Sequence, residues 1–288
     1  MIQKNIFFLF ICILAFSCQT RKHNHITYLN KVNEIDSIYR LKNDTLTALK
    51  MYQTLFKTYS PYNSELIDEY QTYIILSDKY HEDFGGKESL YKLISLVAPN
   101  WKYNRMDKSF FALYKKYGID SLEIEEKVTN WKRGLNKRLV DSFSVASFRD
   151  QEKRRRDAVL RQKNDEKNEQ LLLWTFKNYG YPSLQKIGLW GNNDTFMSMS
   201  ILMNHAADSK RYPYFKEKLL EYIKTGECIP DDYAAMIDKY SLMTEIPEYG
   251  TFSNVPIVDS VRVNKNRKKI GLPSLKHAKK IHDDYFKN

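Results

Sequence analysis

Residues 43–59 read NDTLTALKMYQTLFKTY, and this stretch indicates how the chain folds. Its opening Asn-Asp-Thr is a typical helix start, because short polar side chains accept hydrogen bonds from the free N–H groups of a first turn. Apolar side chains then recur every three or four residues, at Leu46, Leu49, Tyr52, Leu55, Phe56 and Tyr59. Since this spacing places them on one side of an α-helix, the stretch predicts an amphipathic helix that packs on a hydrophobic core.

Similar runs extend in both directions from this helix. They continue to about residue 139, with breaks at Ser60-Pro61, Gly85-Gly86, Pro99 and Gly118. The segments have the length of helical hairpins, but no strict repeat aligns them, so we do not expect a tetratricopeptide array. The pattern resumes after residue 182, and residues 248–263 interrupt it with two short extended segments. The sequence therefore predicts a mainly α fold: irregular helical hairpins over 43–145, then a second helical domain over 146–288 with a small β element near 248–263.

The composition supports this fold class. The 288 residues include only 10 glycines and 8 prolines. An all-β sandwich or barrel would need more of both, because its strands require frequent turns. Hydrophobic residues make up 42% of the chain, which is enough to bury a core and argues against a disordered protein.

The first 18 residues resemble a bacterial lipoprotein signal. An apolar run covers residues 6–16, and as a helix it would cross only about half of a bilayer core. We therefore expect a signal peptide, residues 1–17, rather than a transmembrane helix. Residues 15–18 read Ala-Phe-Ser-Cys, which is similar to a lipobox, and Phe16 is a departure that lipoproteins of the Bacteroidota tolerate. The resemblance implies cleavage before Cys18 and lipidation of Cys18. The alternative is an ordinary secretory signal with an incidental cysteine.

Residues 18–42 are then expected to form the lipidated cysteine, a tether and a first helix. Arg21 and Lys22 follow the cysteine closely where an outward-facing lipoprotein would carry acidic residues, so we expect an anchor in the cell envelope that faces the periplasm. Cleavage removes Lys4 and lowers the formal net charge of +11 by one. It also leaves Cys228 as the only unmodified cysteine, which excludes an intramolecular disulfide and a metal site built on cysteines.

Residues 145–170 are rich in charges of both signs. Opposite charges lie three or four residues apart, which predicts a long, mostly solvated helix that joins the two halves of the protein. The basic balance raises the possibility of a nucleic-acid partner. An exported lipoprotein seldom meets nucleic acid, so an envelope protein or an anionic envelope ligand is the favoured partner beside the membrane itself.

The C-terminal half carries a set of short motifs in a defined order. They are Arg156, Asp165-x-x-Asn168, Gly180-Tyr181-Pro182, Gly188, His205-Ala206, Ala235-x-x-Asp238-Lys239, Tyr249-Gly250-Thr251 and Arg267-x-x-x-Gly271-Leu272-Pro273. In order and spacing, residues 146–285 resemble a family of functionally uncharacterised bacterial domains. The chain departs from the family at three places. The family has Trp at the position of Tyr181 and Arg at the position of Lys239, and it has Gln on both sides of the Tyr249-Gly250-Thr251 motif.

The resemblance implies a candidate site. If these motifs converge, they gather the catalytic candidates His205, Asp238, Tyr249 and Arg267. They also gather the binding candidates Asp165, Asn168, Arg156 and Tyr181. A histidine oriented by a carboxylate can act as an acid or base, and an arginine can hold an anion. The alternative is a buried polar network that holds the helices in register.

Other chemistry finds less support in the sequence. Zinc-protease spacing is absent, so no metal and no cofactor are expected. Cys228 lacks a neighbouring histidine, and His277 and His282 are expected at the surface. Two hypotheses remain open at this point. The favoured one is a lipid-anchored envelope protein that binds a partner, and the other is a hydrolase that acts on an envelope component through a cleft formed by the four catalytic candidates.

Overall fold

The computed structural model describes residues 24–62, 67–242 and 246–286. It is 73% helical, and the described residues contain no strand, so the mainly α fold class is confirmed. An isolated β-bridge joins Trp190 and Phe196. The predicted signal peptide and Cys18 lie outside the described residues. No helix in the described part of the chain has the length and apolar character needed to cross a membrane.

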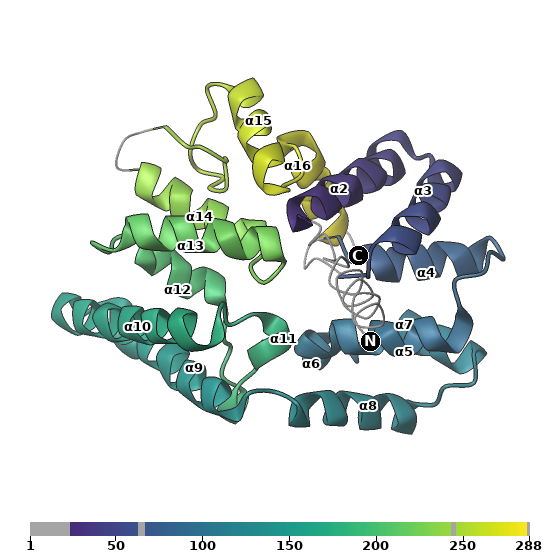
Figure 1. Cartoon of the computed structure of the whole chain (residues 1–288), viewed down its shortest axis with the longest axis horizontal. Coiled ribbons are helices and arrows are strands. Elements are labelled where there is room, and N and C mark those ends of the chain that lie inside the picture. The colour runs from purple at the N-terminus through teal and green to yellow at the C-terminus, as the bar shows by residue number, and fades with distance from the viewer. Residues whose placement is uncertain (1–23, 63–66, 243–245, 287–288) are drawn as a thin grey trace, which may run out of the picture.

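The first half of the fold consists of helices that follow one another closely along the chain (Figure 1). They are α2 (His25–Lys42), α3 (Thr45–Thr58), α4 (Glu69–Lys79), α5 (Gly86–Val97), the short η1 (Ala98–Asn100) and α6 (Trp101–Asn104), α7 (Lys108–Lys116) and α8 (Ser121–Arg133).

The second half continues in the same manner. Its elements are α9 (Lys137–Asp150), η2 (Glu152–Arg155), α10 (Ala158–Tyr179), α11 (Leu184–Ile187), η3 (Asn192–Asp194), α12 (Met199–Ala206), α13 (Tyr212–Thr225), α14 (Pro230–Ser241), α15 (Ser260–Ile270) and α16 (Leu275–Tyr285).

The helix predicted for residues 43–59 is present as α3, and local polar residues define where it begins. Asn43 adopts a left-handed conformation with φ of 54° and ends α2. The carboxylate of Asp44 then accepts a hydrogen bond from the N–H of Thr47 at 3.1 Å. The buried side chains of α3 include Leu49, Tyr52 and Leu55, as the apolar spacing predicted, whereas Leu46 in the first turn is 55% exposed.

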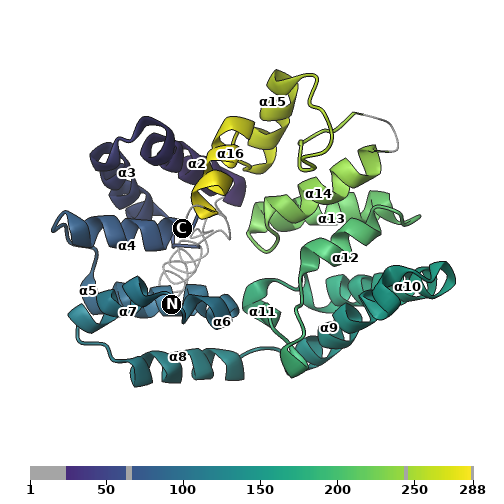
Figure 2. The same cartoon turned by 180° about the vertical axis from the view of Figure 1, so that it is seen from behind.

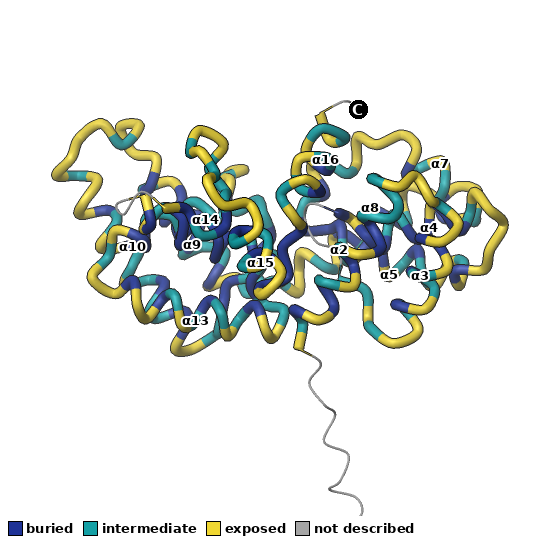
Figure 3. The backbone as a smooth tube through the Cα atoms, turned by 90° about the horizontal axis from the view of Figure 1, so that it is seen from above, coloured by how far each residue is buried: buried dark blue, intermediate teal, exposed yellow. Residues whose placement is uncertain are grey.

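The helices form a closed circuit, because the last helix returns to the first. Figures 1 and 2 show α16 beside α2 from both sides of the molecule. One hydrophobic core lies among α2–α8 and includes Ile281 of α16, and the other lies among α9–α15 and includes Ile26 of α2. Figure 3 shows buried segments in the interior of each half and exposed segments along outer helices such as α13. Helix α2 therefore contributes to both cores, and α16 contributes Ile281 to the core among α2–α8.

Buried polar contacts stabilise the packing of α16 against α2. The imidazole of His277 lies 2.7 Å from the carboxylate of Asp36, and both side chains are buried. Arg40 contacts Asp36 at 2.9 Å and Asp284 at 3.1 Å. The surface position expected for His277 is therefore wrong, since the sequence spacing on α16 does not show that α2 covers this face of the helix.

Gly271, between α15 and α16, allows the chain to turn against α2. Its φ of 87° suits glycine, and a Cβ atom there would lie 2.8 Å from the Cβ of Leu29. Its carbonyl accepts a hydrogen bond from Asn33 at 2.8 Å. The close approach of α2 to the end of α15 thus depends on a residue without a side chain.

The long helix expected over residues 145–170 is wrong, because the chain turns back there. Asp157 caps a new helix by accepting a hydrogen bond from the N–H of Leu160 at 3.0 Å. The following helix, α10, returns alongside α9, so that Arg149 of α9 bonds Asn168 of α10. An antiparallel hairpin therefore replaces the extended linker.

The small β element expected near residues 248–263 is also wrong. Residues 246–259 form a loop without strand pairing, and α15 begins at Ser260. The backbone N–H groups of this loop donate to the carboxylate of Asp238 instead of to a neighbouring strand. The boundary predicted at residues 145 and 146 between two domains stays a prediction.

Candidate functional site

Asp238, on α14, is fully buried and fastens the loop that follows its helix. Its carboxylate accepts hydrogen bonds from the backbone N–H groups of Glu248, Tyr249 and Thr251 at 2.8, 2.8 and 2.7 Å. A fourth hydrogen bond comes from the hydroxyl of Thr251 at 2.9 Å. Four donors occupy the acceptor sites of a carboxylate, so Asp238 is engaged in holding the backbone.

Arg267, on α15, holds the same loop from the other side. Its Nε donates to the carbonyl of Pro273 at 2.5 Å, and one terminal nitrogen donates to the carbonyl of Tyr249 at 2.8 Å. Burial lowers the pKa of Arg267, although the charges of Asp231 and Asp238 oppose this shift. The guanidinium contacts backbone carbonyls rather than an open space where an anion could bind.

Tyr249 completes this network. Its side chain is buried, and burial raises the pKa of its phenol. Its ring packs edge-on against Tyr233, with a centroid separation of 5.9 Å. Three of the four catalytic candidates thus come together, and their contacts are those of a buried polar network that joins α14, the following loop and α15.

His205, the fourth candidate, pairs with a carboxylate that the sequence analysis did not select. Its Nε2 lies 3.3 Å from the Asp150 carboxylate at the end of α9. The Asp150 side chain is 1% exposed and the His205 side chain 22%. Burial raises the pKa of Asp150, but the hydrogen bond to His205 and the charges of His205 and Arg155 outweigh burial and lower it.

This pair has part of what an acid–base catalyst requires. A buried carboxylate that orients a partly exposed imidazole is a common arrangement in such enzymes. Among the described residues, however, no hydroxyl or thiol is hydrogen-bonded to His205 that it could activate as a nucleophile. The pair by itself therefore defines no reaction.

A tight turn next to Asp150 holds the pair in place. Lys153, Arg154 and Arg155 have φ values of 50°, 51° and 58°, in the left-handed region. Each such residue costs about 1–2 kcal/mol when it is not glycine. Arg155 offsets part of this cost, because it donates to Asp150 at 2.7 Å and to both carboxylate oxygens of Asp165 at 3.0 and 2.8 Å.

Asp150 and Arg155 were not predicted as site residues from the sequence. They lie in the charged segment that was interpreted as one solvated helix. The signal that would have revealed a turn is Asp157, a helix-capping residue within this segment, followed by the apolar Ala158 and Val159. The choice of Asp150 as the partner of His205 has no sequence signal, because 55 positions separate the two residues.

The four binding candidates lie in three different settings. Asp165 is bonded to Arg155, and Asn168 accepts hydrogen bonds from Arg149 at 3.0 and 2.6 Å. Arg156 is exposed. Tyr181 is buried against Phe176 near the end of α10, with its hydroxyl donating to Asp232 at 2.5 Å. The structure therefore brings Asp165 and Asn168 onto one helix face and leaves Tyr181 in the core.

An open groove runs along the outer side of the α9–α10 hairpin. Its volume is about 930 Å³. Lys163 and Lys167 are exposed, and neither forms an ion pair with a residue that the structure describes. The residues that line the groove are Asp141, Ser142, Val145, Arg149, Lys163, Glu166, Lys167, Gln170 and Leu171.

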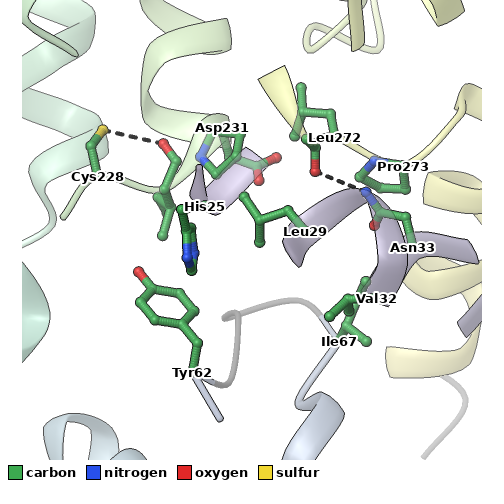
Figure 4. A pocket seen from close by; sticks show the side chains of 13 residues that line it. His25, Leu29, Val32, Asn33, Tyr62, Ile67, Cys228, Asp231, Leu272 and Pro273 are labelled. Atoms are coloured by element: carbon green, nitrogen blue, oxygen red, sulfur yellow. Dashed lines mark hydrogen bonds between the residues drawn. The ribbon is translucent and has the colours of Figure 1, made fainter. Parts of the chain in front are cut away.

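A second cavity lies at the seam where α2 meets the second half of the fold (Figure 4). His25, Tyr62 and Asp231 line it, and its volume is about 30 Å³. Burial lowers the pKa of His25 to about 4 and raises the pKa of Asp231. A cavity of this size holds roughly two water molecules, so it is too small for an organic ligand.

Metal coordination finds no support in the described part of the chain. No group of three or more histidine, cysteine, aspartate or glutamate side chains there could hold a metal ion. Cys228 is buried, and burial raises the pKa of its thiol, which disfavours the reactive thiolate.

Compared with known protein families, with curated proteins and with solved structures, the chain matches none. The resemblance of residues 146–285 to an uncharacterised bacterial domain family therefore stays a prediction.

Proposed function

We propose that this chain is a lipid-anchored cell-envelope protein that faces the periplasm and works as a binding module. In this proposal, Cys18 carries the lipid, and the turn of the α9–α10 hairpin contacts an anionic envelope partner. The lipobox-like residues before Cys18 support the anchor.

The observation that carries the binding proposal is the charge at the end of this hairpin. Between residues 149 and 167 the sequence has eight lysines and arginines against five carboxylates. Several of the carboxylates are engaged within the hairpin: Arg155 bonds Asp150 and Asp165, and Lys153 contacts Asp157 at 3.6 Å. Exposed cations remain without an ion pair to any described residue: Arg154, Arg156, Arg161, Lys163 and Lys167. A turn with an excess of exposed cations favours an anionic partner.

A hydrolase that uses His205, Asp238, Tyr249 and Arg267 in one cleft gains no support from their positions. Asp238 and Arg267 bond backbone groups, and His205 pairs with Asp150. We therefore propose binding rather than hydrolysis.

The anchor is tested by Cys18→Ala in cells fed a radiolabelled fatty acid. We expect the variant to lose both the label and its sedimentation with membranes. A variant that keeps both would show that Cys18 is not the lipidation site.

The anionic partner is tested with fluorescent poly-glutamate as the probe and fluorescence anisotropy as the measurement. The double variant Arg154→Glu/Arg156→Glu should bind the probe at least about tenfold more weakly, since rim charges act through long-range attraction. The matched control is Lys177→Glu/Lys224→Glu, which changes two exposed lysines away from the turn. Equal binding by the two double variants would contradict the proposed site.

A further inference from the structure

We propose that the groove along the α9–α10 hairpin receives an acidic amphipathic helix of a partner protein. This inference rests on the proposed binding function and specifies the partner. The groove lies on the side of the hairpin and includes Lys163 and Lys167, whereas Arg154 and Arg156 lie at its turn.

The two walls of the groove are regular helix faces. Asp141, Val145 and Arg149 lie four residues apart on α9. Lys163, Lys167 and Leu171 repeat the same spacing on α10. Side chains four residues apart form a continuous row on a helix, and two antiparallel rows leave a channel between them. A third helix fits such a channel, because helices pack by placing the side chains of one in the groove of another.

The middle of the groove is apolar and uncovered. Val145 is 59% exposed, and Leu171, which also lines the groove, is half-buried. Phe148, one turn along α9 from Val145, is 74% exposed. An apolar stripe on a partner helix would bury these side chains, which water contacts in the free protein.

The charges around this apolar centre select an acidic helix. Arg149, Lys163 and Lys167 supply three cations. Two carboxylates also line the groove. Asp141 is paired with Lys137 at 3.2 Å and accepts a hydrogen bond from Asn192 at 2.8 Å, whereas Glu166 accepts one only from the neutral Gln162 at 3.1 Å and keeps its charge. The hydrogen bonds from Asn192 and Lys137 lower the pKa of the Asp141 carboxyl and keep it ionised. Three cations against two carboxylates, one of which is paired with Lys137, leave an excess of positive charge that favours partner carboxylates on both sides of an apolar stripe.

Two other partner classes fit less well. A bilayer surface has no row of side chains that could interdigitate with the two helix rows that line the groove. A purely acidic polymer would meet the lysines but would leave Val145 and Leu171 in contact with water. A helix with an apolar stripe and acidic flanks satisfies both features.

The test uses the full chain, embedded in nanodiscs of phosphatidylglycerol, and synthetic fluorescent peptides of about 20 residues, long enough to form a helix. The first peptide carries leucines at helical spacing with flanking glutamates. The second replaces its glutamates with lysines, and the third keeps the glutamates but scrambles the leucines. The anionic lipid repels acidic peptides, and protein-free nanodiscs give the background for all three.

We expect the first peptide to bind at least about tenfold more tightly than the other two. Lys163→Glu/Lys167→Glu should weaken this binding by at least about tenfold, and so should Val145→Asp. Lys177→Glu/Lys224→Glu should leave it unchanged. The substituted positions are exposed, and equal melting curves by circular dichroism would show that the variants fold alike.

Three results would overturn the inference. The scrambled acidic peptide binds as tightly as the first, which would make charge alone sufficient. The groove variants bind the first peptide like the control, which would place its site elsewhere. The groove variants lose capture of phosphatidylglycerol vesicles while peptide binding is unchanged, which would indicate a lipid partner. Poly-glutamate binding that still depends on Arg154 and Arg156 in any of these cases would leave the proposed function intact.

Discussion

Asp238→Asn tests whether a buried carboxylate on α14 stabilises the fold rather than acting on a substrate. The carboxylate accepts four hydrogen bonds from the loop around residue 250. Asparagine keeps one acceptor oxygen and presents an NH₂ group, which cannot accept the N–H of Thr251. Hydrogen bonds to a charged acceptor contribute roughly 1.5–3 kcal/mol each, and a buried donor without an acceptor costs about 1–3 kcal/mol.

We therefore expect Asp238→Asn to lower the free energy of unfolding by about 3 kcal/mol. In a chain of this size, that corresponds to a fall in melting temperature of roughly 6–12 °C. Urea unfolding followed by circular dichroism measures the first quantity. Limited proteolysis should also cut the loop of residues 246–259 faster in the variant, because its backbone is no longer fastened.

The matched control is Asp208→Asn. Asp208 forms an ion pair of 2.7 Å with Lys239, the neighbour of Asp238, but its side chain is 52% exposed. An exposed ion pair contributes less than about 1 kcal/mol, so this variant should be nearly as stable as the parent protein. If the two variants unfold within about 0.5 kcal/mol of each other, the structural role of Asp238 is refuted.

Two further predictions concern the closure between the chain ends. Burial lowers the pKa of His25 from 6.5 to about 4. The folded state therefore binds a proton on the His25 imidazole less readily than the unfolded state does. The free energy of unfolding falls as the pH falls from 6.5 to about 4, by at most about 3 kcal/mol. Urea unfolding at several pH values should show a smaller loss for His25→Gln, and an equal loss would contradict the prediction. His277→Ala should destabilise the protein by about 2 kcal/mol, since it removes one partner of the buried Asp36 while Arg40 remains. His282→Ala, on the exposed side of the same helix, should change the melting temperature little, and equal shifts for the two histidine variants would refute this role for His277.

Short-range features of the fold could be read from the sequence. Asn43 and Asp44 end one helix and begin the next through contacts with residues at most six positions away, so their effect is visible in a short window of sequence. The apolar spacing of α3 predicted most of its buried side chains for the same reason. One helix was wrongly predicted over residues 145–170, because the spacing of opposite charges was given more weight than the helix-capping residue Asp157.

The contacts of the candidate site residues could not be predicted from the sequence. Asp238, Tyr249 and Arg267 were expected to converge, and they do lie together, but only their burial and backbone contacts show that they hold a loop. The hydrolase hypothesis placed His205 and Asp238 in one cleft, whereas the structure pairs His205 with Asp150. Both carboxylates are 33 or more positions from the histidine, so sequence spacing cannot choose between them.

The sequence by itself determined the helical fold class, the positions of many helix ends and the expectation of a lipid anchor at Cys18. These depend on side chains that act within a few residues of one another. Only the tertiary structure decided that α16 closes on α2, that α9 and α10 form a hairpin, and which carboxylates are buried. The physical reason is that burial and long-range pairing depend on which helix faces meet, and the energy of a polar group changes most when those contacts remove it from water.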